Sequence, residues 1–349
     1  MGSNYTYSEI NKQPETWKKT YQQVLENREE ISAKIEALQP DEVIFTGCGT
    51  SYYISISAAY TFGELTGISS KPIPSSEIFL APKAVFPKNK KVLVIAFSRS
   101  GNTSEVVKAV DYVQEHNLAE CISITAYPES DLAKLSNYTI VLPHVQEKSV
   151  VMTGSFTNLL LTSQIIAGIV ANNEAFLKEL NQIPQSATAI WKETEELAKK
   201  VGENPAYQSF IYLGLGGHFG LASEGMLKMK EMTQVSCEAY NPLEFRHGPI
   251  SVVTEEYMII HLANNTIRKY EQDIVKDIQD VKGKVLTIGH DLDGYRSDEK
   301  LNLKASLSDH ASSVLMLPFL QLCAYYRNKL LNLDPDKPRN LNQVVVLDG

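Results

Sequence analysis

Short apolar runs alternate with helical patterns along this 349-residue chain, and this alternation most constrains how the chain folds. In the first half the apolar runs are Glu42–Thr46, Val92–Ala96, Cys121–Thr125 and Tyr138–Leu142. Short strands joined by helices form right-handed crossovers, which place the strands in a parallel sheet covered by helices. The pattern therefore predicts an α/β fold whose ligands bind outside the carboxyl ends of the strands.

The second half of the chain repeats this order. Ser209–Leu213 leads into a glycine loop and a helix, as Glu42–Thr46 does. Three further apolar runs follow it: Tyr257–Leu262, Lys284–Ile288 and Leu301–Leu307. Repetition of one order of elements predicts a duplicated domain, here two doubly wound parallel sheets flanked by helices.

Apolar spacing and breaker residues set the expected domain boundaries. Apolar residues at three- and four-residue steps predict N-terminal helices that end at Pro40. Residues 153–183 are predicted to form one long helix, and Ala187–Val201 and Ala311–Leu331 two others. The predicted parts are N-terminal helices at 1–38, a first domain at 39–195, a second domain at 196–333 and a tail at 334–349.

Charge, cysteine content and apolar stretches narrow the class of protein. The net charge is −8 and is spread along the chain, which argues against nucleic acid as a partner. The four cysteines lie far apart without CxxC spacing, so we expect reduced thiols and a cytoplasmic location. Leu159–Ala171, the longest apolar stretch, contains polar residues and is too short to span a bilayer, so no membrane segment is expected.

Neither a cofactor nor a metal ion is expected. The glycines of Gly214–Gly220 miss the third position of the dinucleotide-binding fingerprint, and no Walker A lysine occurs. The seven histidines show no HxxxH spacing, so the sequence does not indicate metal catalysis.

A polar loop follows the second apolar run, within Val92–Val107. Ser98, Ser100 and Thr103 supply hydroxyls, Gly101 permits close approach, and a helix begins at Thr103 or Ser104. The free amides of a helix N-terminus and these hydroxyls form an anion site that suits a phosphate ester. The alternative is an ordinary strand-to-helix turn, which the local pattern alone does not exclude.

Two further stretches carry candidate residues. The first is the earlier glycine loop, in which Gly49, Thr50 and Ser51 follow a strand. The second is Glu224, Lys228 and Glu231, whose spacing of four and three places them on one face of a helix, followed by His247 in a loop. Two carboxylates around a lysine suit proton transfer next to a carbonyl, and an imidazole suits general acid–base work near neutral pH. A solvated row of salt bridges and an ordinary histidine are the alternatives.

These stretches resemble the motifs of the sugar isomerase (SIS) domain proteins. The residues that carry the resemblance are Gly47–Ser51, Ser98–Thr103, Glu224–Glu231 and Phe245–Pro249. Within that family they are most similar to the isomerase half of glucosamine-6-phosphate synthase and to the AgaS-type amino-sugar-phosphate isomerases and deaminases. The resemblance covers nearly the whole chain and implies two tandem flavodoxin-like subdomains in a homodimer with shared active sites.

The resemblance also implies roles for individual residues. Ser51, Ser98, Ser100 and Thr103 would bind the phosphate of a sugar, with Arg99 in the same loop. Glu231 would move a proton between C1 and C2 with help from Lys228, and His247 would open the ring, in its own subunit or in the partner's. Five further substrate-site candidates are Gly49, Thr50, Thr153, Glu224 and Lys337.

The chain departs from the family pattern in two places. Its N-terminus shows no glutaminase domain, so glutamine hydrolysis is not expected. The tail has Gln343 where the synthase has a sugar-binding lysine, and Lys337 lies six residues upstream, which leaves a covalent imine in doubt. The predicted function is an isomerase or deaminase of a hexosamine 6-phosphate. A fructosamine-6-phosphate deglycase and a non-catalytic sugar-phosphate sensor are the alternatives.

Overall fold

The computed structural model describes residues 4–304, 306–345 and 347. The chain divides into two compact units. The first unit comprises Lys12–Lys148, Met152–Gln182 and the tail from Asn342 onward, and the second comprises the chain up to Asn11, Ser149–Val151 and Ile183–Leu341. These units differ from the predicted parts, because residues 12–38 pack against α9 and so join the first unit.

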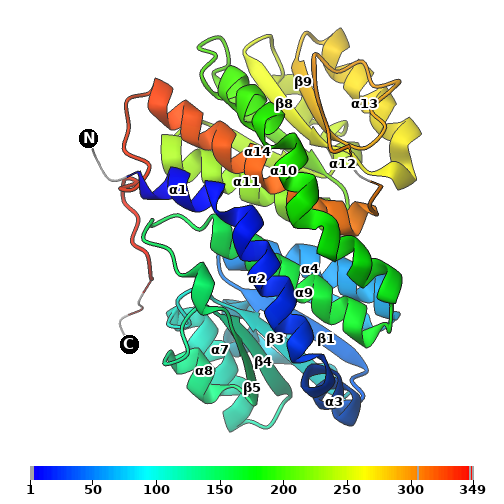
Figure 1. Cartoon of the computed structure of the whole chain (residues 1–349), viewed down its shortest axis with the longest axis vertical. Helices are drawn as coiled ribbons and strands as arrows, with labels where there is room; N and C mark the ends of the chain where they lie inside the picture. The colour runs from blue at the N-terminus through cyan, green and yellow to red at the C-terminus, as the bar shows by residue number, and fades with distance from the viewer. Residues whose placement is uncertain (1–3, 305, 346, 348–349) are drawn as a thin grey trace. The chain divides into compact units, whose positions relative to one another are not determined.

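The first unit is built on a five-stranded parallel sheet of order β2-β1-β3-β4-β5. Helices α7 and α8 lie side by side along it (Figure 1). Its strands are β1 (Glu42–Gly47), β2 (Ser69–Pro74), β3 (Val92–Phe97), β4 (Glu120–Thr125) and β5 (Tyr138–Val141). Its helices are α2 (Gln13–Glu26), α3 (Arg28–Leu38), α4 (Thr50–Thr66), α5 (Ser75–Leu80), α6 (Pro82–Val85), α7 (Ser104–Glu115), α8 (Asp131–Leu135), η1 (Pro143–Val145) and α9 (Gly154–Val170).

The second unit has a sheet of the same order, written β7-β6-β8-β9-β10 when read from the equivalent edge. In this unit α14 packs against α11 (Figure 1). Its strands are β6 (Ser209–Gly214), β7 (Cys237–Tyr240), β8 (Tyr257–Leu262), β9 (Lys284–Gly289) and β10 (Glu299–Asn302). Its helices are α1 (Tyr5–Asn11), α11 (Gly217–Thr233), α12 (Pro242–Phe245), η2 (Pro249–Val252), η3 (Asn265–Ile267), α13 (Arg268–Asp280) and α14 (Asp309–Leu330).

The fold class predicted from the alternation is confirmed. Both sheets are parallel, and in each the first and third strands along the chain are neighbours, which is the doubly wound order. The central strands β1, β3 and β8 are apolar because helices cover both faces of the sheet.

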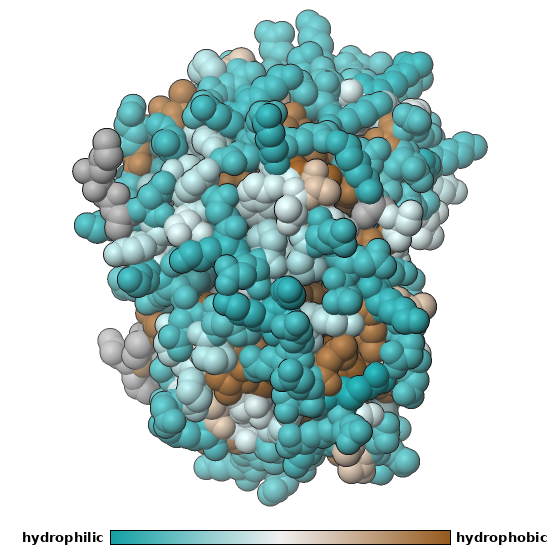
Figure 2. All heavy atoms as spheres, viewed as in Figure 1, coloured by the Kyte–Doolittle hydropathy of each residue, from teal (hydrophilic) through white to brown (hydrophobic). Residues whose placement is uncertain are grey.

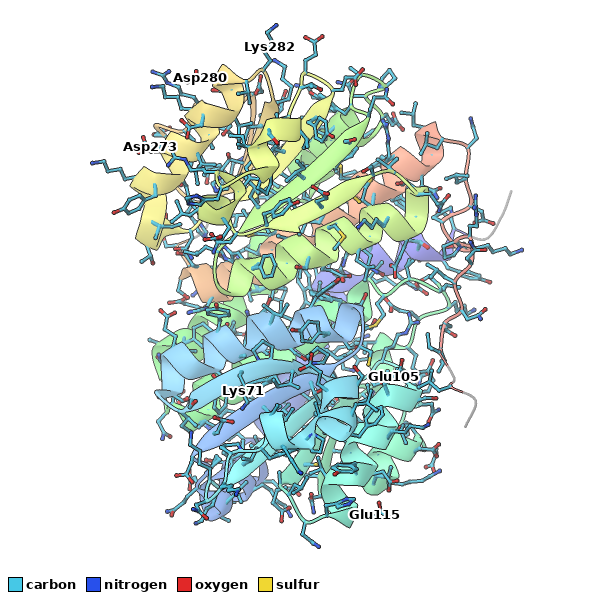
Figure 3. The ribbon with its side chains drawn as sticks, turned by 180° about the vertical axis from the view of Figure 1, so that it is seen from behind. Lys71, Glu105, Glu115, Asp273, Asp280 and Lys282 are labelled. Atoms are coloured by element: carbon cyan, nitrogen blue, oxygen red, sulfur yellow. The ribbon has the colours of Figure 1, made fainter. Side chains whose placement is uncertain are left out.

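Periodicity explains which faces of the helices are buried. Val106, Val110 and Val113 of α7 are fully buried against strand residues of the first sheet. On α13 the apolar residues Ile274 and Ile278 are buried, whereas Asp273 and Asp280 project from the outer face (Figure 3). The visible face of the molecule is mostly hydrophilic, with hydrophobic side chains in separate places (Figure 2).

Helix α9 is buried on every side, and its polar residues have partners. The Nε1 of Trp17 on α2 donates to the Thr157 hydroxyl, 2.8 Å away, and the Thr20 hydroxyl donates to Oδ1 of Asn158, 2.6 Å away. Buried polar groups are stable in a core only with such partners. No helix within the described part of the chain combines the length and the apolar content that a bilayer crossing requires.

Three predicted elements need correction. Residues 153–183 do not form one helix: α9 ends at Val170, and a new helix, α10 (Glu174–Gly202), begins after Asn172, which is left-handed with φ = 50°. Asn173 starts α10, because its side-chain oxygen accepts the amide of Phe176 at 3.0 Å. Pro184 lies inside α10 and does not separate two helices. The strand predicted at Leu301–Leu307 is β10 and ends at Asn302, and β7 was not predicted at all.

Candidate functional site

The predicted phosphate loop lies between β3 and α7, at the carboxyl edge of the first sheet. The loop folds on itself: the Gly101 amide donates to the Ser98 hydroxyl at 3.0 Å, and that hydroxyl lies 3.1 Å from the hydroxyl of Thr103. The Asn102 amide donates to the Ser100 hydroxyl at 3.1 Å. Ser98 is buried, whereas Ser100 and Thr103 are partly exposed. The hydroxyls are therefore collected at the start of α7, where the helix dipole suits an anion.

Gly101 is required by this loop geometry. Its φ is +65°, and a Cβ atom at this position would lie 2.1 Å from the Ser130 hydroxyl oxygen. A side chain is therefore excluded both by the backbone conformation and by contact with Ser130. The close packing brings the start of α8, after Ser130, against the loop, where the Leu132 amide donates to the Gly101 carbonyl at 3.0 Å.

The second predicted loop leaves β1, which is the neighbour of β3. The register pairs Thr46 with Ala96, so both loops leave the same edge of the sheet. Gly49 has a φ of +54°, while Thr50 and Ser51 are buried in the first turn of α4. Burial raises the pKa of the preceding Cys48 thiol to about 11, hydrogen bonds from Ser75 lower it, and the Glu105 carboxylate of α7 raises it further. Figure 3 shows Glu105 and Glu115 at opposite ends of α7, and the influence of Glu105 on the Cys48 pKa places the start of α7 near this loop.

Arg99 does not project freely from the loop. Its side chain is 4% exposed, and Nη1 lies 3.2 Å from a carboxylate oxygen of Glu147. Glu147 also accepts the Thr153 amide at 2.9 Å, the Thr153 hydroxyl at 2.8 Å and both the amide and the hydroxyl of Ser155. Glu147 therefore binds the start of α9 and the guanidinium together. Thr153, a predicted substrate contact, is fully buried in this arrangement.

The tail contacts the same loop. The Gln343 side-chain amide donates to the Glu147 carbonyl at 3.0 Å, and Arg99 Nη2 donates to the Gln343 carbonyl at 3.4 Å. At the start of α7 the Ser104 amide donates to the Val345 carbonyl at 3.3 Å. A cavity of about 290 Å³ lies beside the loop and is lined by Arg99, Ser100, Asn102, Tyr127, Glu129, Ser130, Gln343 and Val344. Sequence reasoning missed both Glu147 and this role of the tail. An acidic residue shortly before a helix start was the one local signal for Glu147.

The predicted catalytic residues Glu224, Lys228 and Glu231 lie in a row on α11 of the second unit. Lys228 Nζ lies 3.4 Å from a carboxylate oxygen of Glu224 and in closer contact with Glu231. The side chains of Glu224 and Lys228 are fully buried, whereas that of Glu231 is 18% exposed. Burial alone lowers the pKa of Lys228, but the two glutamates outweigh burial and raise the pKa above its ordinary value. The three residues form one buried charged row, so a solvated face of salt bridges is not what the structure contains.

His247 lies in the loop after α12 and is exposed. Its amide donates to the Glu244 carbonyl at 3.0 Å, and the next residue, Gly248, has a φ of +132°. The neighbouring Arg246 is paired with Asp277 of α13. Lys337, the predicted lysine of the tail, is exposed in the second unit, whereas Gln343 belongs to the first unit.

The second sheet has no phosphate-type loop at the equivalent edge. After β8 the Asn264 amide donates to the Glu271 carboxylate at 2.9 Å, and the Asn265 amide donates to Asp309 at 2.9 Å. Glu271 is fully buried. The amides that would face an anion in this copy are bonded to carboxylates of the protein itself. Over the described ranges of the chain, we find no group of three or more metal-binding side chains.

Comparisons with known proteins match this architecture. The model of the SIS domain family matches residues 38–167 and 207–290. A glutamine–fructose-6-phosphate aminotransferase (isomerizing) of Sulfurisphaera tokodaii is 29% identical over 347 residues, which cover 99% of this chain and 57% of that protein. The chain thus spans little more than half the length of the curated relatives it matches.

Solved structures of other proteins have a similar fold over nearly the whole chain. The glucosamine-6-phosphate deaminase of Thermotoga maritima is 30% identical, with a TM-score of 0.81 and coverage of 99% of this chain and 100% of that one. The tagatose-6-phosphate ketose/aldose isomerase of Escherichia coli has a TM-score of 0.89 at 22% identity, covers 99% of this chain and 97% of its own, and shows the same fold.

Proposed function

This chain belongs to the SIS domain family, and from that premise we propose that it is an isomerase or deaminase of a hexosamine 6-phosphate. The observation that carries the proposal is the row on α11, in which a partly exposed carboxylate, Glu231, lies against a buried ammonium group, Lys228. A carboxylate next to a fixed cation suits proton abstraction from a carbon beside a carbonyl, because the cation stabilises the negative charge that develops. The match to a glucosamine-6-phosphate deaminase over its whole chain supports this choice of substrate class.

In this proposal the loop after β3 binds the phosphate. Ser98, Ser100, Thr103 and Ser51 supply hydroxyls, and the start of α7 supplies amides, so binding relies on hydrogen bonds and the helix dipole. Arg99 contributes indirectly, because its guanidinium is held by Glu147. The loop anchors the substrate and takes no part in bond making.

The chemistry is assigned to α11 and the loop after α12. His247 protonates the ring oxygen and opens the sugar, which exposes an aldehyde at C1. The Glu231 carboxylate removes the C2 proton, and the C–H electron pair forms the C1–C2 double bond as O1 becomes negative. Return of the proton from Glu231 to C1 uses the electrons of the C1–C2 double bond, while the nitrogen lone pair forms the C2=N bond. Transfer of an N–H proton to O1 then gives the neutral C2 imine of the keto sugar. Water adds to C2 of that imine, and ammonia leaves, so the products are a keto-sugar phosphate and ammonia.

The direct test is incubation of the purified chain with glucosamine, galactosamine and fructosamine 6-phosphates, with ammonia and keto sugar measured. We expect release of ammonia from one of the hexosamine phosphates and its loss in Glu231→Gln. The matched control is Glu238→Gln, an exposed carboxylate on β7, which should leave turnover unchanged.

Other outcomes identify the alternatives. Turnover of fructosamine 6-phosphate alone would indicate a deglycase that uses the same proton transfer. Binding of all three sugars without products would indicate a sensor. The absence of both binding and turnover would refute the assignment to phosphorylated amino sugars.

A further inference from the structure

The buried carboxylate of Glu224 contacts the ammonium group of Lys228 on α11. The side chains of Glu224 and Lys228 have no exposed surface, and 3.4 Å separates the carboxylate from the ammonium group. Glu231, at the other end of the row, is the member with exposed surface. A substrate can therefore reach the row at Glu231, whereas Glu224 is closed off from it.

The charge of this row changes during the proposed reaction. When Glu231 accepts the C2 proton it becomes neutral, and Lys228 then loses one of the two carboxylates that compensate its charge. A buried ammonium without a counter-ion is strongly disfavoured relative to the neutral amine. Glu224 does not exchange a proton with the substrate in this step, so its contact with Lys228 persists.

We propose that Glu224 is a positioning residue that keeps Lys228 protonated and directed toward Glu231 while Glu231 is neutral. The proposal rests on the proposed function and assigns Glu224 a role other than the substrate contact expected from the sequence. Glu224 acts through Lys228, whose ammonium then stabilises the developing negative charge on the substrate.

The elements packed against α11 are β6, β7 and α14. Burial raises the pKa of Tyr212 well above its ordinary value and raises that of Cys237 and of Cys323 to about 12, so all three are neutral near pH 7. Arg327 of α14 donates to backbone carbonyls of Asn204 and Tyr207. The remaining titratable groups of these elements and of α11 are His218, Lys230, Glu238, Tyr240, Asp309, His310, Tyr325, Tyr326 and Lys329.

The first test measures the protonation of Lys228 and needs no turnover. Lysines labelled with ¹³C at Cε are titrated by NMR, and the Lys228 signal is identified by its loss in Lys228→Arg. In Glu224→Gln we expect Lys228 to lose its proton at a pH roughly one to two units lower than in the unaltered chain, with Glu224→Asp intermediate. An unchanged titration in Glu224→Gln overturns the proposal. Melting temperatures check that each variant is folded.

The second test is kinetic. We expect Glu224→Gln to reduce kcat by roughly 10- to 100-fold, the equivalent of one to two pKa units, with little change in KM and an alkaline limb of kcat at lower pH. In a Lys228→Met background the same substitution should cause no further loss of kcat, because Glu224 acts through Lys228.

The outcomes separate the two ideas. An equal loss of kcat with and without Lys228, or full kcat in Glu224→Gln, contradicts the role of Glu224. Failure of the unaltered chain to convert any amino-sugar phosphate refutes the proposed function instead, and the NMR titration then still decides the relation between Glu224 and Lys228.

Discussion

At Gly101 the loop after β3 leaves no room for a side chain. The residue combines a φ of +65° with a Cβ position 2.1 Å from the Ser130 hydroxyl. The first property disfavours any residue with a Cβ, and the second forces the loop or α8 to move. The geometry of the proposed phosphate site therefore depends on glycine at position 101, because glycine has no Cβ atom.

Replacement of Gly101 by alanine is expected to lower the unfolding free energy by about 3 kcal/mol or more, since steric displacement adds to backbone strain. The matched control is Gly67→Ala, because Gly67 also has a positive φ, +72°, but nothing within 4 Å of its Cβ position. The control should cost about 1–2 kcal/mol. Urea unfolding measures both, and equal losses in the two variants would mean that the contact with Ser130 is unimportant.

The hydroxyls of the same loop give a separate prediction about binding. Ser98→Ala together with Ser100→Ala should raise KM for a phosphorylated sugar by roughly 10²- to 10⁴-fold, since hydrogen bonds to charged groups contribute about 1.5–3 kcal/mol each. The control is Ser236→Ala, an exposed serine of the second unit. An unchanged KM in the double variant would remove these hydroxyls from the phosphate site.

Among the elements of the first unit, one residue, Glu147, joins three parts: two through its carboxylate and one through its backbone carbonyl. Glu147 binds the start of α9 through Thr153 and Ser155, the loop after β3 through Arg99, and the tail through the backbone contact with Gln343. The helix start and the guanidinium both attract an anion, so their placement around one carboxylate is mutually stabilising. The tail thereby becomes part of the phosphate-loop structure.

Glu147→Gln is expected to lower the unfolding free energy by about 3–5 kcal/mol, the usual cost of removing one partner of a buried ion pair. Glu129→Gln, at an exposed glutamate that lines the cavity beside the loop, should change it by less than about 0.5 kcal/mol. Calorimetry of both variants tests this. If Glu147→Gln unfolds at the same temperature as the unaltered chain, the carboxylate has no such organising role.

At the scale of the whole molecule, two sheets of identical strand order have different edges. In the first, the loop amides are bonded to loop hydroxyls and to the tail carbonyl of Val345, whereas the second bonds its equivalent loop to the carboxylates of Glu271 and Asp309. An internal carboxylate occupies loop amides as a ligand anion would, so the second copy is stable without a ligand. The phosphate site is therefore proposed in the first copy.

Two buried histidines, His218 and His290, and the half-buried His144 predict how the stability of the protein responds to acid. Burial lowers the pKa of His144, His218 and His290 below the ordinary 6.5, with Lys19 also lowering that of His144. Below about pH 6.5 the unfolded chain therefore takes up protons that the folded chain does not. Their contribution to stability is present above pH 6.5 and is lost as the pH falls below it.

The unfolding free energy should therefore fall between pH 6.5 and pH 5.5, by up to about 1.4 kcal/mol per pH unit for each histidine that stays neutral. His290→Asn should reduce this slope, and His116→Asn, at an exposed histidine of the first unit, should not. Urea unfolding at several pH values measures the slopes. A slope in His290→Asn equal to that of the unaltered chain would show that His290 does not contribute.

The elements and residue groups that depend on local spacing could be predicted from the sequence. Strands such as Val92–Phe97, the glycine loops and the row Glu224, Lys228 and Glu231 follow from periods of two to four residues, which backbone geometry imposes everywhere. Local pattern was less reliable where one residue decides a break: Asn172 ends α9, and Pro184 does not end α10.

Which distant groups form hydrogen bonds or ion pairs with each other became clear from the three-dimensional structure alone. Arg99 and Glu147 are 48 residues apart, Arg99 and Gln343 are 244 apart, and Asn265 and Asp309 are 44 apart. Such pairs leave no periodic trace, because they form wherever the fold brings a donor to an acceptor and burial makes an unpaired group costly. The burial of Glu224 behind Lys228 was decided in the same way, by packing of α11 against its neighbours.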